Sequence, residues 1–125
     1  MKRKREYDEV MTTKRMKFSF ISQCKELLQD LKNHPWSWPF KTPIKPEEWN
    51  LDANYYFALV KFPMDLSRIE EKLDKNEYDN VESFANDVRK IWKNSKMFNL
   101  EEKLKKMVDT LDCIFEEGIA KIKLH

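Results

Sequence analysis

The sequence predicts an all-α domain in which four helices share one core and a long loop joins the first helix to the second. Apolar residues recur at spacings of three and four in four segments, as on one face of a helix. All five prolines fall within residues 35–63, and residues 64–125 contain none. Since four amphipathic stripes bury one another most simply as a bundle, the 125 residues are expected to form one domain around that loop.

The first predicted helix covers residues 18–33, with Ser19 as a suitable N-cap. It should end near residues 33–34, because Pro35 disfavours α geometry in the residue before it. Its core-facing residues are Phe20, Ile21, Cys24, Leu27, Leu28 and Leu31.

The loop that follows, residues 34–64, is rich in proline and aromatic residues. Its apolar residues alternate poorly, so strands are not expected, and residues 54–60 are expected to form a short helix within it. Loops of about 30 residues are uncommon in compact domains and are usually functional. The loop is therefore the first place to look for a binding site.

Two further helices follow the loop. Asp65 is expected to cap the second helix, and residues 76–79 form a turn. Asn80 should cap the third helix, which should end around residues 98–99. The core positions of these two helices share helical spacing: Leu66, Ile69, Leu73, Val81, Phe84, Ala85, Val88, Ile91, Trp92 and Ser95.

The last helix repeats apolar residues at three and four up to the end of the chain. Gly118, the only glycine, lies on this pattern and weakens the helix by about 1 kcal/mol relative to alanine. A close packing contact would explain it. The apolar positions are Leu104, Met107, Val108, Leu111, Ile114, Phe115, Ile119 and Ile122.

Charge divides the chain into two parts. The net charge is 24 − 22 = +2, but residues 1–17 hold seven basic and three acidic residues, so residues 18–125 carry −2. The basic clusters at residues 2–5 and 14–17 fit a bipartite nuclear-import signal, an arm that touches nucleic acid weakly, or a solvated tail. An acidic domain suits a basic peptide better than nucleic acid as its main partner.

Several classes of protein do not fit the composition. With one glycine, a glycine-rich phosphate loop cannot form. The apolar runs are shorter than the roughly 18 residues that a membrane span needs, and the basic N-terminus does not fit a signal peptide. The two cysteines and two histidines have no metal-ligand spacing. We expect neither an enzyme, nor a metal or cofactor, nor a membrane partner.

Four sequence blocks carry a family resemblance. They are WPF at residues 38–40, NYY with KFPMDL at 54–66, SFANDVR at 83–89 and NSKMFN at 94–99. In this order and spacing they resemble the bromodomain family over residues 20–123, within a predicted domain of residues 18–125. The resemblance implies a left-handed four-helix bundle that binds acetyl-lysine without catalysis. The implied site lies at one end, between the long loop and the loop after the third helix.

The resemblance implies hydrogen-bonding roles for two residues. The Asn99 side-chain amide would donate to the acetyl oxygen, although an asparagine here could equally serve as a helix C-cap. The Tyr55 hydroxyl would reach the same oxygen through a water molecule. Alternatively Tyr55 caps the bundle, a role that we expect for Tyr56.

The remaining implied site residues are apolar. Phe40 would contact the acetyl methyl group, with Trp38 and Pro39 as a shelf along the lysine stem. The entrance residue would be Leu104, with Lys103 as the other choice. The walls would come from Ile44, Trp49, Leu51 and Phe98.

The predicted function is that of a nuclear, non-catalytic protein that binds acetylated histone tails and recruits or anchors a chromatin or transcription complex. Other subunits of such a complex would be further partners. The alternative is a helical protein–protein or DNA-tethering module whose slot is closed or repurposed. Three departures from the family pattern leave the width of the slot open: a short connection after Asn99, the extra residues 52–53, and Trp49 in place of a smaller side chain.

Overall fold

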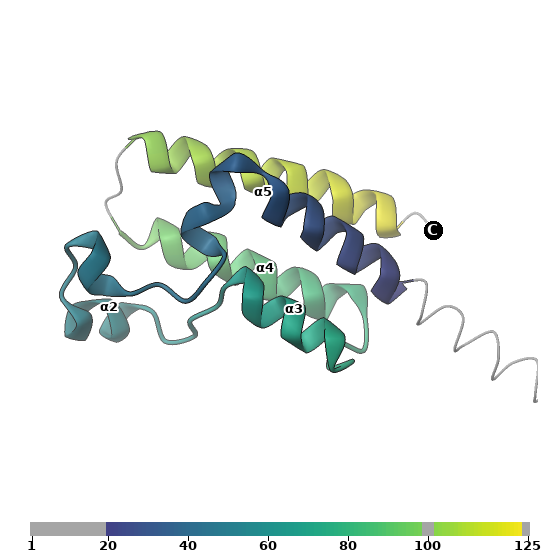
Figure 1. Cartoon of the computed structure of the whole chain (residues 1–125), viewed down its shortest axis with the longest axis horizontal. Helices are drawn as coiled ribbons and strands as arrows, with labels where there is room; N and C mark the ends of the chain where they lie inside the picture. Colours follow the sequence, from purple (N-terminus) through teal and green to yellow (C-terminus); the bar gives the residue numbers. More distant parts are fainter. Residues whose placement is uncertain (1–19, 99–101, 124–125) are drawn as a thin grey trace, which may run out of the picture.

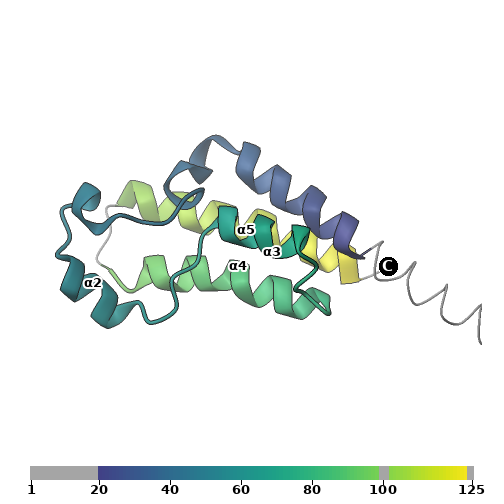
Figure 2. The same ribbon diagram turned by 60° about the horizontal axis from the view of Figure 1, so that its bottom comes forward.

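All regular structure in residues 20–98 and 102–123, the part of the chain that the computed structural model describes, is helical. The order of elements confirms the predicted fold class, and the long helices lie side by side as a bundle (Figures 1 and 2). The elements are a first helix over residues 20–33, the 3-10 helices η1 (Pro35–Phe40) and η2 (Pro46–Trp49), and the α-helices α2 (Ala53–Leu59), α3 (Leu66–Asp74), α4 (Val81–Lys96) and α5 (Glu102–Lys123).

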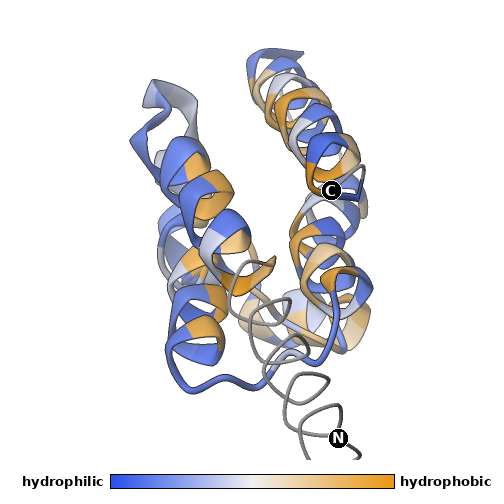
Figure 3. Cartoon of the chain, turned by 90° about the vertical axis from the view of Figure 1, so that its right-hand side faces the viewer, coloured by the Kyte–Doolittle hydropathy of each residue, from blue (hydrophilic) through white to orange (hydrophobic). Residues whose placement is uncertain are grey.

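The bundle has two distinct ends. The short helix α2 and the loops around it lie at one end, and the start of the first helix lies beside the end of α5 at the other (Figures 1 and 2). Apolar segments of the helices face one another, and hydrophilic segments face outward (Figure 3). No helix in the described part of the chain is long and apolar enough to cross a membrane.

The close contact predicted at Gly118 is present between the first helix and α5. A Cβ atom added at Gly118 would lie 2.4 Å from Cδ1 of Leu27, so the Leu27 side chain would have to move to make room for it. Because Leu27 is itself buried, the absence of a side chain at Gly118 lets the two helices approach closely.

The predicted caps of α3 and α4 behave differently. Asn80 caps α4 as expected, because its Oδ1 accepts a hydrogen bond from the Ser83 backbone N–H at 2.8 Å. Asp65 precedes α3, but its buried carboxylate accepts from the Ser67 hydroxyl at 2.5 Å and makes no cap bond to the backbone. Helix α4 ends at Lys96, before the predicted end near residues 98–99.

A buried carboxylate joins α3, the following turn and α4. Asp87 accepts hydrogen bonds from the Tyr78 hydroxyl at 2.6 Å, from Nζ of Lys72 at 2.6 Å and from Nζ of Lys90 at 3.0 Å. Burial alone would raise the pKa of Asp87, but these donors outweigh it and hold the pKa below its ordinary value. Burial, and then the bond to Asp87, raise the pKa of Tyr78.

Candidate ligand-binding site

The WPF segment is folded back against the end of the first helix. The Ser37 hydroxyl, fully buried, donates to the carbonyl oxygens of Lys32 at 3.0 Å and His34 at 2.9 Å. Nδ1 of His34 accepts from the Trp36 backbone N–H at 3.0 Å and thereby caps η1. Phe40, at the end of η1, packs edge-on against the buried Trp92 of α4, with ring centroids 5.6 Å apart.

The second 3-10 helix, η2, ends in a tight left-handed turn. Asn50 has φ of 58°, a conformation that asparagine tolerates better than most residues, and its backbone N–H donates to the carbonyl oxygens of Glu47 and Pro46. The Leu51 N–H also donates to the Pro46 carbonyl, at 3.0 Å. The sequence analysis predicted neither 3-10 helix, although each begins with a proline, which is favoured at the first position of a helix.

The two adjacent tyrosines of helix α2 differ in burial. Asp52 caps it by accepting from the Tyr55 backbone N–H at 3.0 Å. Tyr56 and Val60 lie one helical turn apart and are both buried, whereas Tyr55 is 58% exposed. The Tyr56 ring stacks on Phe98, with centroids 5.2 Å apart and planes inclined by 11°.

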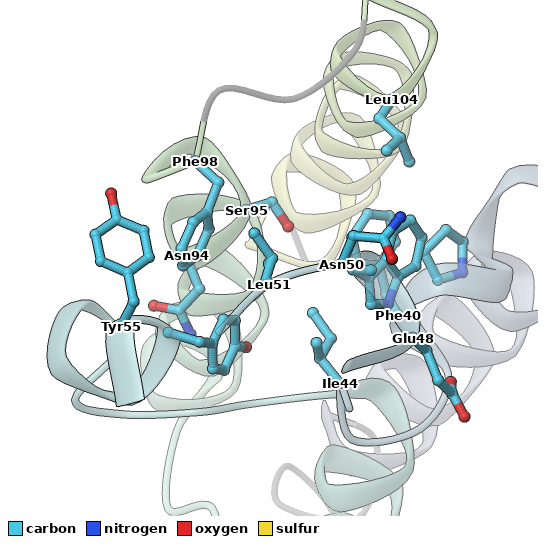
Figure 4. A pocket seen from close by; sticks show the side chains of 13 residues that line it. Phe40, Ile44, Glu48, Asn50, Leu51, Tyr55, Asn94, Ser95, Phe98 and Leu104 are labelled. Carbon is cyan, nitrogen blue, oxygen red and sulfur yellow. The ribbon is translucent and has the colours of Figure 1, made fainter. Parts of the chain in front are cut away.

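These segments enclose a cavity of about 590 Å³ between the long loop, the end of α4 and the start of α5 (Figure 4). Eight of the ten predicted site residues line it: Pro39, Phe40, Ile44, Trp49, Leu51, Tyr55, Phe98 and Leu104. Trp38 lies beside it and stacks on Trp49, with ring centroids 5.6 Å apart. Asn99 lies outside the described residues. The structure therefore places nine of the ten predicted residues in or beside one cavity, while their roles toward a ligand stay predictions.

The cavity also has lining residues that were not among the ten predicted site residues: Glu48, Asn50, Tyr56, Asn94 and Ser95. The Ser95 hydroxyl donates to the Ile91 carbonyl at 3.1 Å, and the Asn94 amide donates to the Phe62 carbonyl at 3.0 Å. Ser95 was expected at a core position of this helix, and it lies one turn after Ile91 on the buried face of α4.

The two tyrosines differ in burial and in their place around the cavity. Tyr55 lies at the edge of the cavity, and its hydroxyl points away from Phe40 and Ile44 (Figure 4). Tyr56 is 4% exposed, and burial raises its pKa. The capping role expected for Tyr56 thus coincides with a place in the wall of the cavity, and Tyr55 lies at its rim.

The lining is aromatic, aliphatic and amide, and none of its described members is basic. Glu48 is its only described acidic member, and its carboxylate points outward, away from Leu51 and Ser95 (Figure 4). Such a slot can accept a neutral, narrow group with an apolar stem. An ammonium group inside it would lose its hydration, which costs several kcal/mol.

Histidine, cysteine and acidic side chains are the usual protein ligands of metal ions. Among the described residues, no group of three or more histidine, cysteine, aspartate or glutamate side chains is placed to hold a metal ion. Cys24 is buried in the core, where burial raises the pKa of its thiol to about 12, and Cys113 is exposed on α5; both are free.

Comparison with known proteins gives a consistent family assignment. Residues 24–107 match the family described as Bromodomain. The histone acetyltransferase GCN5 of Debaryomyces hansenii is 41% identical over 75 residues, which cover 60% of this chain and 16% of that protein. The nucleosome-remodeling factor subunit NURF301 of Drosophila melanogaster is 32% identical over 107 residues, which cover 85% and 4%. The transcription factor GTE1 of Arabidopsis thaliana is 33% identical over 98 residues, which cover 78% and 25%. The chain thus spans a quarter or less of the length of these relatives.

Proposed function

We propose, from the premise that this chain belongs to the bromodomain family, that its cavity binds the acetylated lysine side chains of histone tails. Bromodomains bind acetyl-lysine, and a chain that is essentially one bromodomain is a non-catalytic reader module. The observation that carries the proposal is the cavity itself, which gathers eight of the predicted site residues and has no basic residue among its described lining.

The physical basis of the proposed selectivity is desolvation. Acetylation replaces an ammonium group by a neutral amide, which can enter an apolar slot without the cost of burying a charge. The narrow stem of the lysine would lie along Pro39 with its acetyl methyl group at Phe40, and the wall of Tyr56 and Phe98 would face it. Asn99 is proposed as the donor to the acetyl oxygen. A single neutral hydrogen bond contributes only about 0.5–1.5 kcal/mol, so one site should bind weakly.

The proposal is tested by titrating the full chain with acetylated and unmodified forms of the same histone peptides. Asn99→Ala should weaken binding of the acetylated peptide by about 1–3 kcal/mol, because the buried acetyl oxygen loses its donor. Asn86→Ala is the matched control, because Asn86 is exposed on α4 and does not line the cavity. Equal affinity for the two peptide forms, or unchanged affinity in a folded Asn99→Ala protein, would contradict the proposal.

We further propose that the protein works in the nucleus, where it anchors a chromatin or transcription complex. Relatives named as a histone acetyltransferase, a nucleosome-remodeling subunit and a transcription factor support this setting. The basic clusters in residues 1–17 support nuclear import or a weak contact with nucleic acid. Titration with DNA, with and without residues 1–17, separates a reader from a DNA-tethering module, since the module would bind DNA without any acetyl preference.

A further inference from the structure

Two tryptophans from different 3-10 helices form a stack at the rim of the cavity. The rings of Trp38 in η1 and Trp49 in η2 have centroids 5.6 Å apart and planes inclined by only 11°. Trp49 lines the cavity, whereas Trp38 is 60% exposed, so much of its indole ring remains in contact with solvent. The stack therefore presents exposed aromatic surface next to the place where the acetyl-lysine stem would enter.

A carboxylate accompanies this aromatic face. Glu48 directly precedes Trp49 in η2 and lines the same cavity, with its carboxylate pointing outward (Figure 4). Within residues 20–98 and 102–123, neither Glu48 nor its neighbour Glu47 forms an ion pair. A carboxylate that points outward does not contact a neutral acetyl group inside the slot. It can attract a positive charge just outside the slot.

We propose that the Trp38–Trp49 stack and Glu48 form a second subsite, which binds a positively charged side chain, preferentially arginine, next to the acetyl-lysine of the same peptide. This inference rests on the function proposed above and adds a sequence preference to it. Acetylation itself does not supply this cation, so the subsite distinguishes acetylated peptides from one another by their neighbouring residues.

The preference for a cationic side chain follows from the chemistry of the tryptophan stack and of Glu48. The face of an indole ring attracts cations more strongly than that of any other aromatic side chain, and it favours arginine because the planar guanidinium can stack on it. The carboxylate of Glu48 adds charge complementarity, which is weak and sensitive to salt in an exposed pair. Lys41 and Lys45 lie exposed between η1 and η2 and oppose this attraction. Removal of one of these lysine charges should therefore strengthen the preference.

The test compares pairs of acetyl-lysine peptides that differ only in having arginine or glutamine at one neighbouring position, for each such position in turn. We expect arginine to lower the Kd of the full chain by about three- to tenfold at one or more positions, and salt to reduce this gain. In Trp38→Ala and in Glu48→Gln the gain should shrink to about twofold or less. Glu47→Gln, the matched control, should retain it, and Lys45→Gln should increase it.

Two outcomes would overturn the subsite: equal affinity for the arginine and glutamine peptides at every position, or a gain that survives in both Trp38→Ala and Glu48→Gln. Either result leaves the preference of the wild-type chain for acetylated peptides in place. Failure of the proposed function looks different, because acetylated and unmodified peptides would then bind equally whatever their neighbouring residues.

Discussion

Large apolar side chains are buried in the bundle helices α3, α4 and α5, but many of them are exposed in the loop of residues 34–65. Phe84 on α4 and Phe115 on α5 are fully buried and contact each other, with ring centroids 5.9 Å apart. Six of the seven large apolar side chains that are exposed in the described residues belong to the loop: Trp36, Trp38, Tyr55, Phe57, Leu59 and Phe62. The bundle supplies stability, and the loop keeps aromatic surface available for contacts outside the domain.

The largest expected effect is loss of stability from a core substitution in the bundle. Phe84→Ala should lower the free energy of unfolding by about 3–5 kcal/mol, because it removes a fully buried ring that packs against Tyr78 and Phe115. Chemical denaturation of wild type and variant measures this. A loss below about 1 kcal/mol would show that the core collapses around the missing ring, and would weaken the contrast with the loop.

The next effect concerns the buried carboxylate of the bundle and its dependence on pH. Asp87→Asn should cost about 1–3 kcal/mol at neutral pH, because it removes the charge that Lys72 and Lys90 bond. Since folding lowers the pKa of Asp87, its charged form stabilises the fold above about pH 4 and this contribution is lost as pH falls further.

The effect of Asp87 is measured by thermal unfolding of wild type and of Asp87→Asn over a range of acidic pH. Glu82 and Glu116 also have lowered pKa values, through Lys123 and Arg89 respectively, so both proteins should lose stability in acid. The difference in stability between wild type and Asp87→Asn reports on Asp87 alone, and it should become smaller as pH falls. A difference that stays constant would show that its ionisation is not coupled to folding.

The smallest effect is expected from an exposed side chain of the loop. Phe62 is 70% exposed, and Nζ of Lys90 lies 5.9 Å from its ring centroid. Phe62→Ser should change the free energy of unfolding by about 0.5 kcal/mol or less. Its carbonyl bond to Asn94 belongs to the backbone and survives. A loss above about 2 kcal/mol would mean that the loop aromatics carry part of the core, contrary to the comparison.

The bundle helices could be predicted from the sequence in more detail than the loop. Burial of Leu66, Ile69 and Leu73 followed from helical periodicity, and so did the close contact at Gly118. In the loop no element is long enough to show a period, so η1 and η2 could not be recognised from spacing. The family resemblance selected the residues of the cavity without fixing how they point.

The adjacent tyrosines show this limit most clearly. Successive residues of a helix point about 100° apart, so whether Tyr55 or Tyr56 faces the bundle depends on the residue at which α2 begins. Asp52 sets that start by capping the helix, and Tyr56 consequently turns inward. Two tyrosines in a row carry no signal for this choice, whereas Tyr56 and Val60, four residues apart, share one helical face in the structure.

The positions of the described chain ends have a practical consequence. The start of the first helix and the end of α5 lie together at the end of the bundle opposite α2 (Figures 1 and 2). A group joined directly to residue 20 or residue 123 would therefore be attached at the end of the bundle opposite α2. Attachment at these two residues would leave the cavity end of the bundle open for the titrations above.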